Sequence, residues 1–190
     1  MADEHHLILR LQQRDEDALS QVFNDHADQV YRLAISLLHD EQQADGVVQN
    51  TFLILIKHVD RFEGKASIGT WLYRVAYNEC MGRLRRAKPQ FPLDDMLDDD
   101  FMPDNFTSWD GVPDEALKSR EAMAEMEHAI TTLSPALRSV FVLRDVEGLT
   151  TSETAEALDI TESAVKVRLH RARLLLREKL ADYFEEYVRS

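Results

Sequence analysis

Apolar side chains recur at three- and four-residue steps along most of this chain, and this spacing constrains the fold more than any other feature. Residues that form turns are scarce. The 190 residues include 6 glycines and 5 prolines, and four of the prolines fall within residues 89–113. An all-β fold needs many tight turns, whereas long helices need few. The sequence therefore predicts an all-α protein.

Three amphipathic helices are expected between Asp15 and about Lys88. The first runs to a break at residues 38–40, and the second ends near residues 60–64. The third begins near Ser67, whose hydroxyl is suited to cap its first turn, and Pro89 stops it. This region, residues 1–88, is the expected first domain, with three to four helices.

Helical periodicity returns at Asp114 and continues to the end of the chain. Ser134 and Pro135 have the types typical of an N-cap and a first helical position. A region of this size buries little apolar surface, so about four packed helices with short connections are the economical arrangement. Residues 114–190 are the expected second domain.

Residues 89–113 between them show neither helical nor strand periodicity and are expected to form an acidic linker. Apolar residues punctuate this linker, which fits either a segment that docks on a partner or a tether that rests on its own domains. They are Phe91, Leu93, Met96, Leu97, Phe101, Met102, Phe106 and Trp109.

The net charge of −13 argues at first against nucleic acid as a partner. The acid is unevenly distributed, however. Residues 1–88 carry 13 acidic and 11 basic side chains, residues 89–127 carry 12 and 2, and residues 128–190 carry 10 and 9. Two basic runs remain, at residues 83–88 and 163–177. The composition is therefore compatible with DNA binding.

Other classes of protein fit the sequence poorly. Cys80 is the single cysteine, which excludes an internal disulfide and a Cys-only metal cluster, and we expect it to be buried as a small apolar side chain. No segment has the pattern of a signal peptide or of a membrane span, so a cytoplasmic protein is expected. The seven histidines are scattered, and no catalytic or phosphate-binding motif appears. We expect no enzymatic activity, catalytic residue, cofactor, metal site or small-molecule substrate.

Residues 150–169 have the layout of a helix-turn-helix. Thr150 and Glu153 are spaced for a capping box, Ala155 is small where two helices would cross, and Leu158 and Ile160 flank the turn. The inward face of the second helix, which Thr161 is expected to cap, holds Ala164, Val165, Leu169 and Ala172.

The second helix of this motif is strongly basic: residues 163–177 hold five basic and no acidic side chains. Such a helix fits the DNA major groove, although exposed basic residues are also often merely solvated. We expect five of its side chains to project outward, Lys166, Arg168, His170, Arg171 and Arg173. By position, base edges are expected at Lys166, His170 and Arg171, and phosphates at Thr161, Ser163, Arg168 and Arg173.

Residues 133–180, LSPALRSVFVLRDVEGLTTSETAEALDITESAVKVRLHRARLLLREKL, resemble the fourth conserved region of bacterial sigma factors. The resemblance is greatest to the extracytoplasmic-function (ECF) subgroup of the sigma-70 family, whose recognition helix binds the promoter −35 element. Residues 17–86 are similar to the subgroup's second region, which binds the polymerase clamp and melts the −10 element. The resemblance implies a factor that directs RNA polymerase to promoters and assists DNA melting.

The resemblance also implies partners and sites. The partners are core RNA polymerase, promoter DNA and an inhibitory anti-sigma factor, with this chain a monomer on the polymerase. Polymerase binding falls on Val48, Gln49, Phe52 and Leu53, and Val167 joins the −35 contacts. Melted-strand binding falls on residues 62–68 and the helix that follows, where the side chains suit stacking on bases, reading of base edges and contact with the backbone. These are Lys65, Ser67, Trp71, Tyr73, Arg74, Tyr77, Asn78, Arg83, Arg85 and Arg86. Trp71 also fits a purely structural role in the core.

The chain departs from the subgroup at several positions. Gly46 stands where an acidic residue is usual, which locally weakens the helix and implies lower affinity for core polymerase. Ala164 and Val167 replace hydroxyl residues, and Thr154 replaces an apolar one. Promoter preference therefore does not carry over from relatives.

Other hypotheses stay open at this point. The linker's acidic run either imitates nucleic acid in the RNA path of the polymerase or shields the basic helix of the chain itself. It consists of Asp94, Asp95, Asp98, Asp99 and Asp100. As rivals to a sigma factor, a helix-turn-helix regulator that acts without the polymerase core and a sigma-like module without initiation activity both fit the motif.

Overall fold

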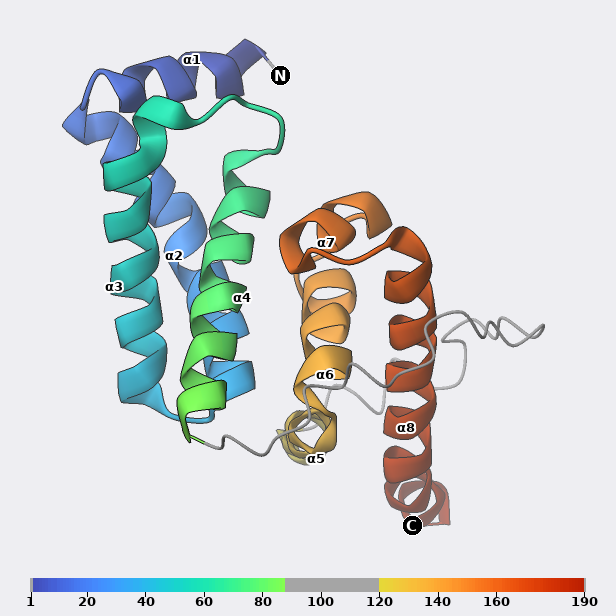
Figure 1. Ribbon diagram of the computed structural model, residues 1–190. Helices are drawn as coiled ribbons and strands as arrows, with labels where there is room; N and C mark the ends of the chain where they lie inside the picture. Colours follow the sequence, from blue (N-terminus) through green and yellow to red (C-terminus); the bar gives the residue numbers. More distant parts are fainter. Residues whose placement is uncertain (1, 88–119, 190) are drawn as a thin grey trace.

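The computed structural model describes residues 2–87 and 120–189 (Figure 1). Over these residues the chain consists of helices and their connections, with no strand, so the prediction of an all-α fold is confirmed. The predicted linker at residues 89–113 lies outside the described residues, as do its apolar residues and its acidic run. The predicted domain boundaries on either side of it remain predictions.

The N-terminal bundle consists of α1 (Ala2–Gln12), α2 (Glu16–Leu38), α3 (Glu41–His58), the short η1 (Val59–Arg61) and α4 (Ile68–Ala87). The expected breaks are confirmed. Asp15 caps α2, His39 ends it in the left-handed conformation at φ 53°, and Asp40 caps α3. The Ser67 hydroxyl accepts a hydrogen bond from the Thr70 backbone N–H at 3.0 Å, and α4 begins at the next residue.

Helix α1 was not predicted, although Leu7, Ile8 and Leu11 supply an apolar stripe. A helix of this length is marginal by itself, so packing decides whether it forms. The Gln12 amide donates to the Val59 and Phe62 carbonyls at 3.3 Å, and Glu4 accepts from the Ile68 backbone N–H at 3.0 Å. These bonds tie α1 to the connection that leads into α4.

The C-terminal bundle consists of α5 (Arg120–Thr132), α6 (Pro135–Phe141), η3 (Val142–Val146), α7 (Thr151–Leu158) and α8 (Glu162–Arg189). The expectation of about four helices is confirmed, and Ser134 and Pro135 take the predicted cap and first-turn positions. Sequence periodicity gave no sign of η3, one turn of wider π-helix between α6 and α7.

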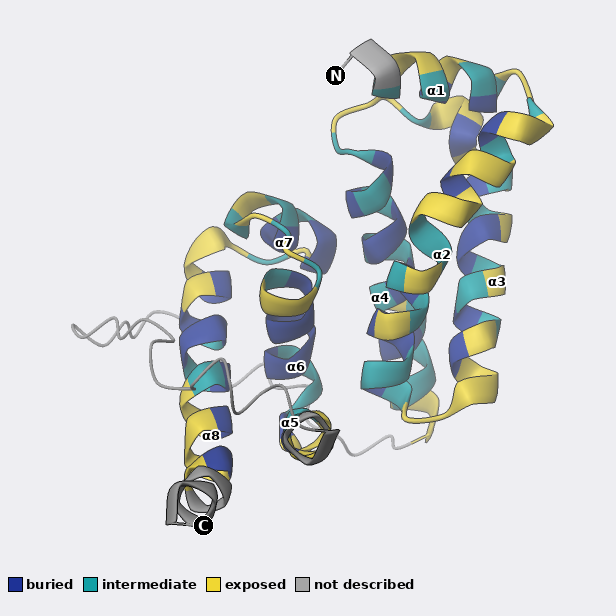
Figure 2. Ribbon diagram, turned by 180° about the vertical axis from the view of Figure 1, so that it is seen from behind, coloured by how far each residue is buried: buried dark blue, intermediate teal, exposed yellow. Residues whose placement is uncertain are grey.

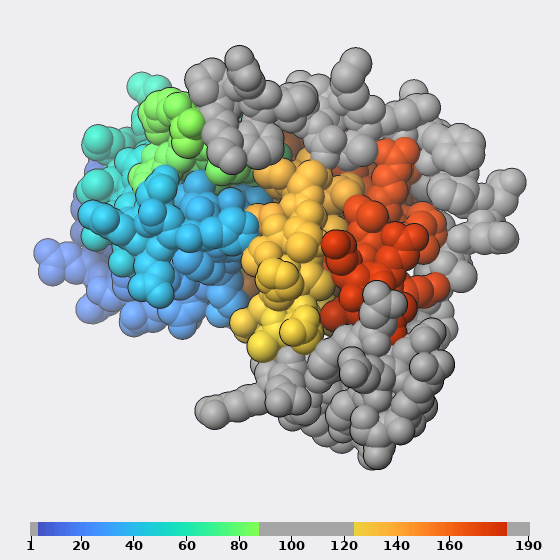
Figure 3. All heavy atoms as spheres, turned by 90° about the horizontal axis from the view of Figure 1, so that it is seen from below, coloured from blue at the N-terminus to red at the C-terminus, as the bar shows by residue number. Residues whose placement is uncertain are grey.

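The two bundles share one core. Their buried apolar side chains form a single contiguous cluster, in which Leu33 of α2 and Leu143 of η3 are both fully buried. In Figure 2 the buried faces of α2 and α4 are turned toward those of α6 and α7. Figure 3, which views the molecule from below, shows α2 packed against α5 and α6. The sequence predicted helical faces but not this packing of one bundle on the other.

Arg138 of α6 joins three helices at this junction. Its side chain is only 5% exposed, and its guanidinium donates to the Leu133 carbonyl at 2.6 Å and to the Ser36 carbonyl at 2.7 Å. Both carbonyls lie near the C-terminal ends of helices, where the backbone carries partial negative charge. Burial lowers the pKa of Arg138 to about 10, so the side chain remains charged at neutral pH.

Cys80 provides a test of this core. It is completely buried on α4, as predicted, and burial raises the pKa of its thiol to about 12. Because the thiolate is the reactive form, the native protein should react with Ellman's reagent at pH 8 roughly a hundredfold more slowly than the urea-unfolded protein.

A matched control for this measurement is a Cys80→Ala protein that carries Asn78→Cys, because residue 78 is exposed on the same helix. The control should react rapidly while folded. Rapid reaction of native Cys80 would show that α4 is not packed as described.

Candidate nucleic-acid and polymerase interface

The predicted helix-turn-helix is present as α7 and α8, and side-chain hydrogen bonds cap the first turn of each helix. The Glu153 backbone N–H donates to the Thr150 hydroxyl at 3.2 Å, and the Thr150 backbone N–H donates to the Glu153 carboxylate at 2.8 Å, which completes the predicted capping box. Asp159 ends α7 at φ 56°, in the left-handed region. The Thr161 hydroxyl then accepts from the Ala164 backbone N–H at 3.1 Å.

The inward face of α8 is also as predicted, since Ala164, Val165, Leu169 and Ala172 are all buried. On the outward side Thr161, Ser163 and Lys166 are exposed, whereas Arg168, Arg171 and Arg173 are half-buried. The Arg173 guanidinium forms a fork on the Asp145 carboxylate, with distances of 2.9 and 2.7 Å.

Two residues of the predicted −35 contact set are buried. His170 is 7% exposed and Val167 is 0% exposed. The expectation that His170 projects outward is therefore wrong for this arrangement. Helical periodicity orders side chains around an axis, but it does not indicate how many sides of the helix will be covered.

The predicted melted-strand residues lie along α4 and the connection before it. Lys65, Asn78, Arg85 and Arg86 are exposed, and Ser67, Trp71, Arg74, Tyr77 and Arg83 are half-buried. The Trp71 ring packs edge-on against the Phe62 ring, with 6.1 Å between centroids. Lys65 pairs with Glu63 at 2.5 Å in full contact with solvent.

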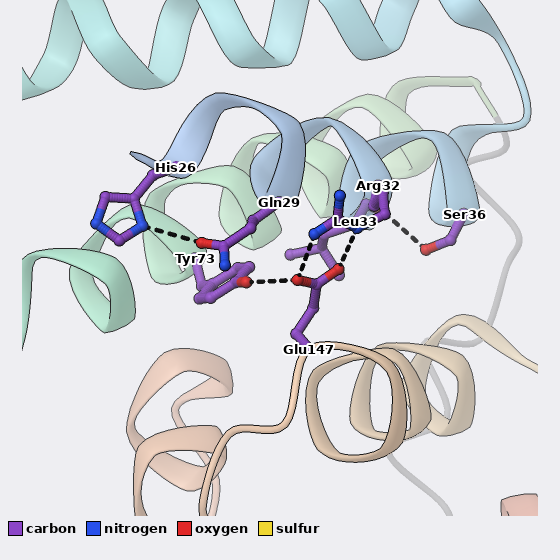
Figure 4. Close-up of polar contacts among 7 residues, drawn as sticks. All are labelled: His26, Gln29, Arg32, Leu33, Ser36, Tyr73 and Glu147. Atoms are coloured by element: carbon purple, nitrogen blue, oxygen red, sulfur yellow. Dashed lines mark hydrogen bonds and ion pairs between the residues drawn. The ribbon is translucent and has the colours of Figure 1, made fainter. Parts of the chain in front are cut away.

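Tyr73 differs from the rest of this set because it is buried, at 4% exposure. Its hydroxyl donates to the Glu147 carboxylate at 3.2 Å, and the same carboxylate accepts both arms of the Arg32 guanidinium at 2.6 and 2.8 Å (Figure 4). Burial and the nearby carboxylate raise the pKa of Tyr73 above its usual range. The hydrogen bond to Glu147 raises the pKa of Arg32.

Arg83 explains what Gly46 does in this chain. Its guanidinium donates to the Glu79 carboxylate and to the Gln43 carbonyl, both at 2.9 Å. A Cβ atom at residue 46 would lie 3.0 Å from an Arg83 nitrogen. Gly46 therefore leaves room for the Arg83 guanidinium to lie against α3.

The predicted polymerase-binding residues lie on α3. Gln49 and Leu53 are exposed, Val48 is half-buried and Phe52 is 5% exposed. The Phe52 ring lies 4.8 Å, centroid to centroid, from the ring of Phe23 on α2. Phe23 is 46% exposed and Leu53 is 53% exposed. Large apolar side chains exposed in this way are typical of contact surfaces.

Neither a membrane span nor a metal centre emerges from the described helices. Within residues 2–87 and 120–189, no helix is both long enough and apolar enough to cross a membrane. Over the same ranges, no cluster of three or more His, Cys, Asp or Glu side chains has the arrangement of a metal site.

Two family models match this chain in the order that the helices follow. Residues 22–90 match sigma-70 region 2, and residues 123–176 match sigma-70 region 4. The first match covers most of the N-terminal bundle, and the second includes α6, α7 and the basic part of α8.

Sequence relatives extend these matches over nearly the whole chain. It is 30% identical over 181 residues to the ECF RNA polymerase sigma factor SigW of Bacillus subtilis, covering 92% of this chain and 95% of that protein. It is 31% identical over 164 residues to the ECF RNA polymerase sigma factor SigM of Mycobacterium tuberculosis, covering 85% of this chain and 76% of that protein.

Solved structures share the fold. CnrH, in complex with the cytosolic domain of CnrY, superposes with a TM-score of 0.68 at 23% identity, over 94% of this chain and 97% of CnrH. The sigma factor RpoE of Bartonella quintana, in complex with the anti-sigma factor NepR, superposes with a TM-score of 0.63 at 21% identity, over 85% of this chain and 96% of RpoE.

The helix-turn-helix contains a pair of threonines that makes its energetics testable. Thr154 is completely buried, and its hydroxyl has no hydrogen-bond partner among the described residues. Replacing it by valine, which has a similar shape, removes an unsatisfied buried group and should raise the free energy of unfolding by about 1 kcal/mol.

The same substitution at the cap, Thr150→Val, should lower the free energy of unfolding by about 1 kcal/mol, because it removes the capping hydroxyl. Urea denaturation followed by circular dichroism measures both variants. Equal signs for the two substitutions would contradict the hydrogen bonding described for α7.

Proposed function

Since this chain belongs to the ECF subgroup of the sigma-70 family, whose members direct RNA polymerase to promoters, we propose how its two bundles divide that function. The observation that carries the proposal is that both sigma regions occur in one chain, in family order, each on its own bundle. Sigma factors are non-catalytic initiation factors. Binding energy alone supplies what promoter melting requires.

The N-terminal bundle binds core RNA polymerase through the outer side of α3. Leu53 and Gln49 are exposed there, and Phe23 of α2 extends the apolar surface by its contact with Phe52. An exposed apolar centre with a polar surround is typical of residues that dominate binding energy at interfaces. At residue 46 itself there is no side chain, and the Arg83 guanidinium lies next to this position.

Helix α4 and the connection that precedes it bind the unpaired −10 strand. Trp71, Tyr73 and Tyr77 offer rings for base stacking, Ser67 and Asn78 read base edges, and basic residues follow the backbone. These basic residues are Lys65, Arg74, Arg83, Arg85 and Arg86.

The C-terminal bundle binds the duplex −35 element by inserting the start of α8 into the major groove. Thr161, Ser163 and Lys166 are exposed at this end of the helix and make the first contacts. Arg168, Arg171 and Arg173 follow along the same helix and complete the contact set, whereas Val167 and His170 are buried and are left out of it.

The remaining assignments rest on the family. We place the chain in the cytoplasm, where it acts as a monomer on the polymerase, with an anti-sigma factor as its inhibitor. RpoE, a neighbour in fold, was solved with such a factor. The functional domains are residues 1–88 and 114–190, joined by the linker at 89–113. A regulator that acts without the polymerase core is not favoured, because such a regulator does not need a sigma-70 region 2, which this chain matches at residues 22–90.

Polymerase binding is tested at Leu53. Because this side chain is largely exposed, Leu53→Asp should leave the fold intact and lower the affinity for core polymerase at least roughly tenfold. Fluorescence anisotropy of the labelled chain with core polymerase measures this affinity. The matched control is Leu9→Asp on α1, since Leu9 is also exposed, at 43%. Equal affinities of the two variants would refute the assignment of α3.

Upstream recognition is tested at Lys166 in transcription reactions with core polymerase and a pool of promoters from the chain's own genome. Lys166→Ala should reduce promoter-specific transcripts by roughly tenfold and leave core binding unchanged. Lys179→Ala, an exposed lysine farther along α8, is the control. If the wild-type chain binds polymerase but yields no promoter-specific transcript, it is a sigma-like module without initiation activity.

A further inference from the structure

The C-terminal bundle covers part of the surface that we assign to the unpaired −10 strand. We call the covered part, which consists of Tyr73 and Arg74, the α4 face. Tyr73 is 4% exposed, and its ring is therefore unable to stack on a base while the bundles are packed together. The Arg74 guanidinium donates to the Glu156 carbonyl of α7 at 2.9 Å, so it is also occupied.

Glu147 forms a buried polar contact between the bundles. Its side chain is 2% exposed and lies just after η3, where the Glu147 backbone N–H bonds to the Val142 carbonyl and Gly148 follows at φ 74°. The carboxylate reaches across to the N-terminal bundle, where it meets the fork of Arg32 and the hydroxyl of Tyr73 (Figure 4). We call Glu147, Arg32 and Tyr73 the Glu147 cluster.

A buried carboxylate is stable only when its hydrogen bonds are satisfied, and a bidentate guanidinium is among the strongest partners available. Arg32 and Tyr73, which donate hydrogen bonds to the Glu147 side chain, both belong to the other bundle. Separating the bundles therefore breaks the whole set of bonds at once and returns each group to water. Arg138 adds an independent contact at the far end of α2, with its bond of 2.7 Å to the Ser36 carbonyl.

The DNA-reading end of α8 is exposed in the same arrangement. Thr161, Ser163 and Lys166 face solvent while Tyr73 and Arg74 are covered. The packing of the bundles therefore leaves the duplex-binding end of α8 accessible, but it covers residues that we assign to the unpaired strand.

We propose that the α4 face binds either the C-terminal bundle of this chain or unpaired DNA, and that the Glu147 cluster holds it in the first state. The inference rests on the proposed role of α4 in strand binding. The free chain is closed, and it captures a single strand only when Glu147 releases Arg32 and Tyr73. A closed majority lowers the apparent affinity for single-stranded DNA by the fraction of chains that are open.

The test uses the full-length chain with Glu147→Gln, which keeps the shape of the side chain and removes its charge. Binding of a fluorescein-labelled, mixed-sequence 12-nucleotide single strand is measured by anisotropy. The variant should bind this probe roughly tenfold more tightly than the wild type, because the charge-assisted bonds that oppose opening are weakened. Its affinity for duplex promoter DNA should not change, since the start of α8 is exposed in both states.

Glu156→Gln is the matched control. Glu156 contributes its backbone carbonyl to Arg74, so changing its side chain leaves that bond in place. A second variant, Arg32→Gln, removes the other side of the ion pair and should raise single-strand affinity as Glu147→Gln does. The two substitutions together should then add little beyond either one, because they remove the same interaction.

Small-angle X-ray scattering provides a readout that does not depend on DNA. The radius of gyration should be larger for Glu147→Gln than for the wild type and the Glu156→Gln control. An unchanged radius would overturn the role of Glu147 in closing the chain.

A larger radius with unchanged, measurable single-strand affinity would overturn the competition. If wild type and Glu147→Gln both fail to bind the strand, even with core polymerase present, the proposed strand-binding role of α4 fails, whereas the radius still tests closure.

Discussion

The bidentate pair between Glu147 and Arg32 joins the two bundles, together with their shared apolar core. A carboxylate at 2% side-chain exposure is unfavourable unless every lone pair finds a donor, and here the donors come from α2 and α4. The wide turn of η3 and the left-handed Gly148 set the position from which Glu147 reaches them. Local backbone geometry in one bundle thereby determines which surface of the other bundle is accessible.

This packing places structural and functional demands on the same residues. Tyr73 contributes its ring to the core and its hydroxyl to Glu147, yet its residue type and position on α4 suit base stacking. Arg74 and Arg83 likewise bond to carbonyl oxygens of the protein, although each suits contact with phosphate. Under the proposed role of α4, strand capture must therefore replace bonds that these side chains already make within the chain. A factor that opens only when polymerase and promoter together supply enough binding energy is protected from capturing single strands alone.

Local patterns predicted the helices and their caps because those features depend on neighbours in the sequence. The break at His39, the first turn at Pro135 and the Thr150–Glu153 capping box are all set by residues within four positions of one another. Contacts between the bundles depend on residues about a hundred positions apart, such as Arg32 with Glu147 and Ser36 with Arg138. Periodicity could not predict them, and for the same reason it missed α1 and placed His170 in solvent.

The competition between the C-terminal bundle and unpaired DNA is tested most directly by a distance between the bundles. Nitroxide labels at Lys57→Cys on α3 and Lys179→Cys on α8 are suitable because both positions are exposed, whereas the native Cys80 is buried. Double electron–electron resonance would then be recorded on the free chain and with a saturating single strand. We predict one narrow, short distance without DNA and a longer, broader distribution with it. A strand that binds while the distance stays short and narrow would contradict the account.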